Sequence, residues 1–342
     1  MQQFLKGLPK VELHAHLNGS LGIKSLCDLG ERLYGSTSEE FLKLCARFSR
    51  FEKEMDMNAC FEKFAFVHEL TSTPEGLRFA TELAIRDFAQ DNVQYVELRT
   101  TPKANANYSR RDYLQIVIDA IRRAKETYPA ITVKLLPSIN RAEPVAVAEE
   151  TASLAVELAQ AHPNLILGID LSGNPGKGRF SDFAPILAQA RAKGLKLVIH
   201  CAEIENPSEV KEMLQFGMSR CGHGTFLTPE DIEQLKQRNI AIECCLTSNV
   251  KSGTVPSLEE HHLKRIMEAD AHKVICTDDS GVFDTTLTKE FVIAAETFGL
   301  TREHCVDLTF EAVNHSFASE QERIEMVDKV ATYMAIWSKE KN

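Results

Sequence analysis

The sequence lacks the features of a membrane protein or of a nucleic-acid-binding protein. Its 342 residues contain no apolar run long enough to span a bilayer, and Met1 is not followed by a charged and then apolar leader. Acidic residues outnumber basic ones by 49 to 39, and the formal net charge of −10 argues against nucleic acids and anionic membranes as general partners. We therefore expect neither a nucleic-acid polymer nor a membrane as a partner. We also expect a cytosolic monomer that binds a small molecule.

The chain also lacks a disulfide framework. Its nine cysteines are an odd number and include no CxxC pair. Cys244 and Cys245 are adjacent, and Cys201, Cys221 and Cys276 fall inside apolar runs. Buried free thiols in a reducing compartment are the expected state.

Nucleotide-binding glycine motifs are missing as well. No predicted strand is followed by GxGxxG or by a P-loop lysine motif. The stretch SGNPGKG at 172–178 resembles a phosphate loop only loosely, and we interpret it as a glycine-rich turn. Of the two α/β architectures, a closed barrel and an open doubly wound sheet, the open sheet is therefore less favoured.

Strand and helix patterns alternate through most of the chain. Strands are predicted in eight stretches: 10–19, 94–101, 132–139, 165–171, 195–200, 219–222, 240–246 and 273–277. Helices are predicted at 21–33, 39–51, 58–70, 74–90, 110–127, 144–161, 181–193, 207–216, 229–238 and 258–268, and from about 287, 301 and 320. Several strands are continuously apolar, as strands buried on both faces should be. The pattern predicts one α/β domain over 1–342, a (β/α)8 TIM barrel, with a helical insert at about 21–90 over its C-terminal mouth.

The first strand carries two histidines in alternate positions. Successive side chains of a strand point to opposite faces, so His14 and His16 lie on the same side. Two imidazoles at the end of a strand can share a metal ion. Read alone, the pair could equally be two polar residues on a half-exposed edge strand.

More titratable residues end other strands. His200 ends the fifth strand and Glu203 follows it, His223 ends the sixth, and Asp278 and Asp279 end the eighth. In a (β/α)8 barrel the carboxyl ends of the strands form the active site. Each residue alone could be a loop histidine or a helix cap, but three histidines and a carboxylate gathered there suit zinc.

Seven motifs together resemble the adenosine and AMP deaminase branch of the metal-dependent amidohydrolases. They are LPKVELHAHLNGS, YVELRTTPK, GIDLSGN, HCAE, CGHG, CLTSNV and CTDDSGVF, and the likeness runs from about Leu8 to Phe317. The likeness is strongest to the members of this branch that deaminate N6-methyl-AMP. The resemblance implies a zinc barrel that hydrolyses an amine from the six-position of a purine, here releasing methylamine and IMP.

The resemblance also implies roles for individual residues. The zinc ligands would be His14, His16, His200 and Asp278. We expect one Zn²⁺, because the lysine that bridges two metals on strand four of other amidohydrolases is absent from LILGIDLSG. Glu203 and His223 would be catalytic: His223 deprotonates the attacking water, and Glu203 protonates the ring nitrogen beside the attacked carbon. Asp279, Gly173 and the ligand His16 would also contact the purine.

Asn18 bears on whether the substrate is a nucleoside or a nucleotide. Nucleoside-specific relatives have Asp at the matching position, where a carboxylate would repel a 5′-phosphate. Thr100, Thr101, Pro102 and Lys103 follow strand two, and with His68 they resemble the contacts of nucleotide-specific members. Read singly, the lysine could be solvated, the threonines could cap a turn, and the histidine could lie on a helix surface.

Two features leave alternatives open. The family pattern has Asp where this chain has Asn140, which we expect to bind ribose all the same; Arg141 could contact phosphate or form an ion pair at the barrel rim. Of Phe61, Phe64 and Phe66, one or two could line the space for an N6 substituent. The rival functions are an adenosine deaminase, a non-catalytic purine-binding barrel, and a metal-dependent hydrolase of another substrate class.

Overall fold

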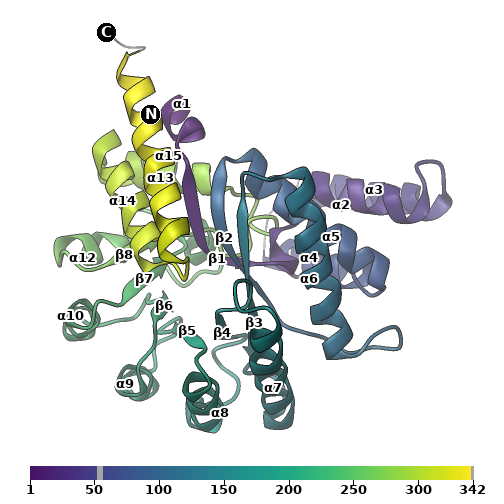
Figure 1. The fold of residues 1–342 in the computed structure, drawn as a ribbon, viewed down its shortest axis with the longest axis horizontal. Helices are drawn as coiled ribbons and strands as arrows, with labels where there is room; N and C mark the ends of the chain where they lie inside the picture. Colours follow the sequence, from purple (N-terminus) through teal and green to yellow (C-terminus); the bar gives the residue numbers. More distant parts are fainter. Residues whose placement is uncertain (52–56, 340–342) are drawn as a thin grey trace.

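The computed structural model describes residues 1–51 and 57–339, and its centre is a parallel sheet of eight strands in sequence order (Figure 1). The strands are β1 (Lys10–His16), β2 (Val93–Thr100), β3 (Thr132–Asn140), β4 (Gly168–Ser172), β5 (Lys196–Cys201), β6 (Arg220–His223), β7 (Ala241–Cys244) and β8 (Lys273–Ile275). The first and last strands meet just beyond β8, where Asp278 N donates to His14 O at 2.7 Å and His16 N donates to Asp278 O at 3.0 Å. The predicted (β/α)8 barrel is confirmed.

A layer of helices surrounds the strands (Figure 1). Its members are α5 (Pro74–Gln90), α6 (Arg110–Thr127), α7 (Val145–Ala161), α8 (Phe180–Ala192), α9 (Pro207–Phe216), α10 (Pro229–Gln237), α12 (Leu263–Glu268) and α13 (Leu287–Phe298). Local signals set several of their first residues: Pro74, Pro207 and Pro229 each occupy the first turn after a residue whose side chain accepts from the third helical N–H.

One part of the segment between β1 and β2 lies at the barrel mouth, and another part belongs to the outer layer of helices. It contains a short 3-10 turn, η1 (Asn18–Ser20), and the helices α2 (Ile23–Tyr34), α3 (Glu39–Phe51) and α4 (Met57–Leu70) before α5. Phe64 and His68 of α4 line the cavity at the barrel mouth, as do Asn18 and Gly19 of η1. α5 instead packs beside α6 in the outer layer. The part of the insert that reaches the mouth is therefore η1 with α4.

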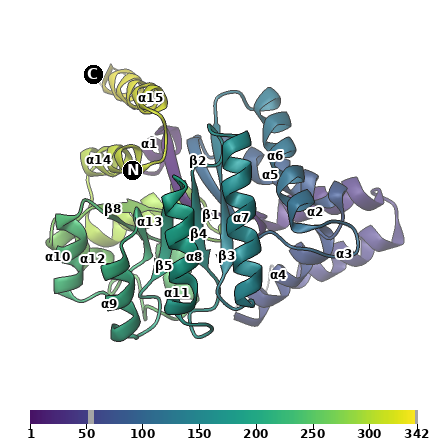
Figure 2. The ribbon, with the colours of Figure 1, turned by 60° about the horizontal axis from the view of Figure 1, so that its bottom comes forward.

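Helices close the opposite end of the barrel. α1 (Gln2–Gly7), α14 (Arg302–His315) and α15 (Glu320–Lys339) lie away from α4 (Figure 2), and α14 packs against β8 and β1. Phe317, just after α14, packs on Leu136 and Val198, and the Arg220 guanidinium carbon lies 4.1 Å from its ring centre. None of the described helices combines the length and the apolar character that crossing a bilayer requires.

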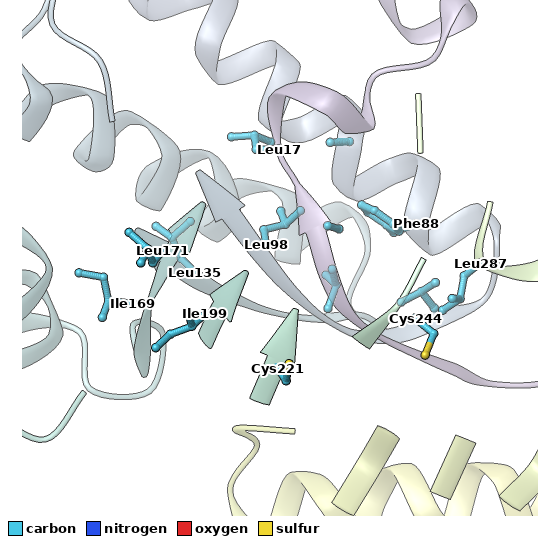
Figure 3. Close-up of a cluster of buried hydrophobic side chains, with 14 of the residues drawn as sticks. Leu17, Phe88, Leu98, Leu135, Ile169, Leu171, Ile199, Cys221, Cys244 and Leu287 are labelled. Carbon is cyan, nitrogen blue, oxygen red and sulfur yellow. The ribbon is translucent and has the colours of Figure 1, made fainter. Parts of the chain in front are cut away.

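The main hydrophobic core lies between the strands and the helical layer. Leu98, Leu135, Ile169 and Ile199 of the strands are fully buried, and Figure 3 shows such side chains beside Phe88 of α5 and Leu287 of α13. Among the described cysteines no disulfide occurs, and Cys201, Cys221, Cys244, Cys245 and Cys276 are buried, as expected for reduced thiols.

Many boundaries lie one to three residues from the predicted ones, and those of β4, β7 and α12 differ in local structure as well as in position. β4 begins at Gly168, and Leu165 and Ile166 before it make only an isolated bridge with Leu135. β7 ends at Cys244 because the chain turns at once into α11 (Leu246–Lys251), a helix that the apolar pattern concealed. The helix predicted from 258 begins at Leu263.

Candidate active site

A cavity of about 660 Å³ opens at the C-terminal mouth of the barrel. Most of the residues singled out in the sequence line it: His16, Asn18, His68, Thr100, Thr101, Lys103, Asn140, Gly173, His200, Glu203, His223, Asp278 and Asp279. His14 and Pro102 are buried and do not line the cavity. The structure therefore brings most of these side chains together at one end of the barrel.

Side-chain atoms of β1, β5 and the β8 end converge at the cavity floor. Nε2 of His16 lies 3.2 Å from Nε2 of His200 and 3.3 Å from Oδ1 of Asp278. Nε2 of His14 lies 3.3 Å from the same Oδ1. Ligands about 2.0–2.1 Å from a tetrahedral zinc ion are about 3.3 Å apart, so these separations match such a shell.

Carboxylates behind two of these histidines fix their tautomers. His14 Nδ1 donates to Glu243 at 2.8 Å, and His200 Nδ1 donates to Asp170 at 3.1 Å. Each Nε2 then presents a lone pair, and burial lowers the pKa of His200 to about 3, which keeps that ring neutral. Nε2 of His14 is buried without a hydrogen-bond partner. An acceptor atom left unpaired in the interior is what a metal ion would satisfy.

His223 faces the same point from β6. The ligand atoms of His223, His14, His200 and Asp278 all lie within 4.8 Å of one another, and this group does not include His16. Nε2 of His223 is 3.9 Å from Oε2 of Glu203, on the cavity side. His16 instead approaches two of the group, His200 at 3.2 Å and Asp278 at 3.3 Å, so both His16 and His223 are candidate ligands by position.

The carboxylates that orient the histidines belong to a buried charge network inside the barrel. Arg99 pairs with Asp170 and Glu243, and Arg220 pairs with Glu97 and Glu243; all five side chains are fully buried. Burial alone would raise the pKa of Glu243, but the two guanidinium groups outweigh it and hold that pKa well below its usual range. Removing one partner would leave an uncompensated interior charge.

Strand ends at the site adopt backbone angles that are uncommon for residues with a side chain. φ is +60° at His223, +61° at Asp278 and +55° at Ala202. Left-handed angles in non-glycine residues are unfavourable, and they cluster where a site needs a particular side-chain direction. Here they turn the side chains of β6 and the β8 end toward the cavity floor.

α11 supplies supporting contacts that the sequence patterns did not predict. Ser248 Oγ donates to Oδ2 of Asp278 at 2.7 Å, and Asn249 Nδ2 lies 3.3 Å from Nδ1 of His223. His262 Nε2 lies 2.8 Å from the carbonyl oxygen of His223. The motif CLTSNV was the available signal, because a hydroxyl and an amide side by side after an apolar strand can serve a strand-end site.

Two carboxyl groups on the cavity wall are held in low-dielectric surroundings. Burial raises the pKa of Glu203 above its usual range. Burial, with the neighbouring Asp278 charge, raises the pKa of Asp279 to about 8. In its protonated form, each of these carboxyl groups can donate a hydrogen bond to a heterocyclic base.

The comparisons with known proteins give the family. The adenosine deaminase family model matches residues 9–333. The chain belongs to the adenosine deaminase family. An adenosine deaminase-like protein of Drosophila melanogaster is 88% identical over 98% of this chain and 99% of its own length. The human N6-methyl-AMP deaminase is 38% identical over 95% of this chain and 93% of its own. A crystal structure of Arabidopsis ADAL complexed with IMP matches with a TM-score of 0.85 at 34% identity, covering 96% of this chain and 98% of that one.

The chain is thus a deaminase, a hydrolase that acts on a carbon–nitrogen bond. Its relatives of known structure share the barrel, and one of them holds a nucleotide. The resemblance seen in the seven motifs is confirmed.

One rim of the deaminase cavity is basic. Nζ of Lys103 lies 3.0 Å from Nδ1 and 2.9 Å from Nε2 of His68, which reaches it from α4. Burial and the Lys103 charge lower the pKa of His68 to about 4, and burial lowers the pKa of Lys103. Asn18 lines the same cavity, while the Thr100 hydroxyl is shared with the Tyr113 hydroxyl at 2.7 Å.

The structure distinguishes between the alternatives for the remaining residues. Arg141 donates to Glu209 at 2.6 Å and to the carbonyl of Lys177 at 2.8 Å, so it forms a rim ion pair. Phe64 lines the cavity and Phe66 is buried in the core. The side chain of Phe61 lies outside the described residues.

Proposed function

We propose that this deaminase is a zinc-dependent enzyme that hydrolyses N6-methyl-AMP to IMP and methylamine. The observation that carries the proposal is one cavity with two chemically different ends. The histidine–aspartate cluster forms its floor, and the Lys103–His68 pair lies on its rim beside the uncharged Asn18. The first suits a hydrolytic metal and the second suits a phosphate group.

His14, His16, His200 and Asp278 would hold a single Zn²⁺. Three imidazoles and one carboxylate are a donor set that zinc accepts, and the buried, unpaired Nε2 of His14 supports the fit. When bound, zinc supplies a water whose pKa falls to about 7. β4 contributes no lysine that could bridge a second ion.

Protein groups around the ligands would move the protons. His223 would accept the proton of the attacking water. Glu203, whose pKa is raised, would donate a proton to the ring nitrogen adjacent to the six-carbon and make that carbon more electrophilic. Water adds at the six-carbon, the bond to the N6 nitrogen breaks, and that nitrogen leaves as methylamine with the proton it gains.

Other cavity residues would hold the substrate still. Asp279 and the backbone of Gly173 would contact the remaining edge of the base, with His16 beneath it. Asn140 would contact the ribose, and its side chain is already fixed because Oδ1 accepts from Ala142 N at 2.9 Å. Thr100, Thr101, Pro102 and Lys103 would form the phosphate end with His68 and Asn18.

The relatives support a nucleotide substrate. The human relative is an N6-methyl-AMP deaminase, and the Arabidopsis relative was crystallised with IMP, the product that this reaction would give. Phe64 on the cavity wall offers an apolar surface for the methyl group.

Purified protein assayed with N6-methyl-AMP, AMP and adenosine tests the proposal. We expect kcat/KM to be highest for N6-methyl-AMP, with IMP and methylamine formed in equal amounts. Faster turnover of adenosine than of either nucleotide would establish a nucleoside deaminase instead. Release of no amine from any of the three would contradict both assignments.

A further inference from the structure

A second group of potential metal ligands lies at the end of the barrel opposite the cavity. It consists of His272, directly before β8, and Glu311 and His315 of α14, and we call it the α14 cluster. Its three ligand atoms lie within 4.8 Å of one another. Nδ1 of His272 is 2.6 Å from Oε1 of Glu311, and Nε2 of His315 is 3.7 Å from the same oxygen.

The α14 cluster is built on rigid elements. Glu311 and His315 are four residues apart and therefore share one face of α14. α14 packs directly along β8 (Figures 1 and 2). The carbonyl oxygen of His315 accepts from Arg220 at 3.0 Å, which ties the last turn of the helix to β6.

Ions from solution can reach the α14 cluster. A surface groove of about 600 Å³ is lined by His272 and Glu311, together with His304 and Asp307 of the same helix. The side chains of His272 and Glu311 are 32% and 27% exposed. A ligand shell here can therefore be completed by water.

We propose that His272, Glu311 and His315 bind a divalent transition-metal ion of the zinc class. Two imidazoles and one carboxylate form a donor set that suits zinc and its neighbours and does not suit magnesium or calcium, which prefer oxygen ligands. Without a metal ion, Glu311 forms ion pairs with both histidines through one oxygen, at 2.6 Å to His272 and 3.7 Å to His315. The longer pair is beyond hydrogen-bond distance, whereas a shared metal ion would ligate all three side chains.

Metal bound here would join the start of β8 to α14 at the closed end of the barrel. It would change the stability of the fold and leave the chemistry at the mouth unaltered, because the bottom of a (β/α)8 barrel serves the fold. An ion that binds only the native state raises the unfolding temperature as its concentration rises above its dissociation constant.

Zinc stoichiometry of the holoenzyme tests the α14 cluster. The wild-type protein, Glu311→Gln, His272→Gln and the control His304→Gln are dialysed against micromolar free Zn²⁺, and bound metal is measured by mass spectrometry. The control removes a histidine of the same groove that is outside the cluster, and glutamine can still serve the capping box that His304 makes with Thr301. We expect wild type and the control to bind one more equivalent than either cluster variant, and to show a zinc-dependent rise in unfolding temperature that those variants lack.

Two results would overturn the proposal: equal zinc content in all four proteins, or loss of the extra equivalent in the control alone. Zinc-edge anomalous diffraction from wild-type crystals keeps the test decisive if a variant does not fold. A peak among the three side chains supports the site, and a map with zinc only at the mouth contradicts it. The difference between wild type and Glu311→Gln is independent of whether the mouth site binds zinc.

Discussion

Gly19 packs directly against the carboxylate of Asp279: a Cβ added to Gly19 would lie 1.6 Å from Oδ1 and 2.6 Å from Cβ of that aspartate. The overlap involves the base of the side chain as well as its tip, so rotation of the carboxylate alone does not relieve it. The turn after β1 and the end of β8 therefore fit together only with glycine at this position.

Gly19→Ala should lower kcat/KM by about 100-fold, because a displacement of about 1 Å at an active site costs about that much. Gly22→Ala is the matched control, since a Cβ there meets nothing within 4 Å and its φ of −70° is ordinary. Steady-state kinetics and metal analysis of both variants check this. A Gly19→Ala enzyme with normal kinetics would show that Asp279 takes no part in binding the base.

Glu203→Gln should reduce kcat by about 10²–10⁴-fold, the usual contribution of a general acid, while zinc content stays unchanged. The amide keeps the size of the side chain but cannot supply the proton. Glu205→Gln, two residues along in the same exit loop, serves as the control. Unchanged turnover of Glu203→Gln would support a different proton donor and would favour a non-catalytic, purine-binding barrel if the wild-type rate were equally low.

Asp278→Asn should lose bound zinc and activity together. The substitution keeps the side-chain shape and removes the charge that faces His14 and His16 at 3.3 Å. Asp284→Asn, a substitution of an exposed carboxylate, should leave both unchanged. Chelation of the wild-type enzyme should abolish activity, and zinc should restore it. Full activity in metal-free protein would refute the zinc mechanism.

Asn18→Asp should shift preference from nucleotide toward nucleoside. Two unit charges about 4 Å apart repel by about 4 kcal/mol at an effective dielectric constant of 20, which corresponds to about a thousandfold loss in kcat/KM for N6-methyl-AMP. The kcat/KM for the nucleoside N6-methyladenosine should change far less. Equal losses for both substrates would indicate that Asn18 does not face the phosphate.

Nucleotide binding should take up protons through His68. In the free protein its pKa is about 4, so the ring is neutral at neutral pH. A phosphate dianion beside it favours the charged form and raises that pKa, so affinity should fall as pH rises through the raised value. Calorimetry of IMP binding at about pH 6, in buffers of different ionisation enthalpy, measures the uptake. Inosine, which has no phosphate, should show none, and neither should IMP with His68→Asn; equal uptake for IMP and inosine would exclude His68 as the group.

The sequence was sufficient to predict the architecture and to identify most of the side chains that face the cavity. Continuous apolar strands separated by amphipathic helices identify a barrel, and in a barrel the last residue of each strand marks the mouth. His200, His223 and Asp278 could therefore be placed together although they are far apart in the chain. Their backbone angles, left-handed at His223 and Asp278, could not be foreseen, because those depend on the packing around the mouth.

The supporting residues were harder to predict. Asp170 and Glu243 occur in apolar strands without a local partner, since Arg99 and Arg220 come from other strands. The start of α11 is indistinguishable from a strand in the sequence, because its first residue continues the apolar run of β7. Arg141 could be assigned to an ion pair only once Glu209 was seen beside it.

The contact between the β1 end and Asp278 has a consequence for biogenesis. It consists of backbone hydrogen bonds between segments more than 260 residues apart in the chain. Three of the four residues that would bind the metal ion, His14, His16 and Asp278, take part in these bonds. Contacts of such long sequence separation form late in folding. A nascent chain carries His14 and His16 from the first moments of synthesis, yet it cannot assemble the site until the last strand has left the ribosome. Binding of the proposed metal ion would thereby require the completed chain, and no N-terminal fragment should hold the ion or turn over substrate.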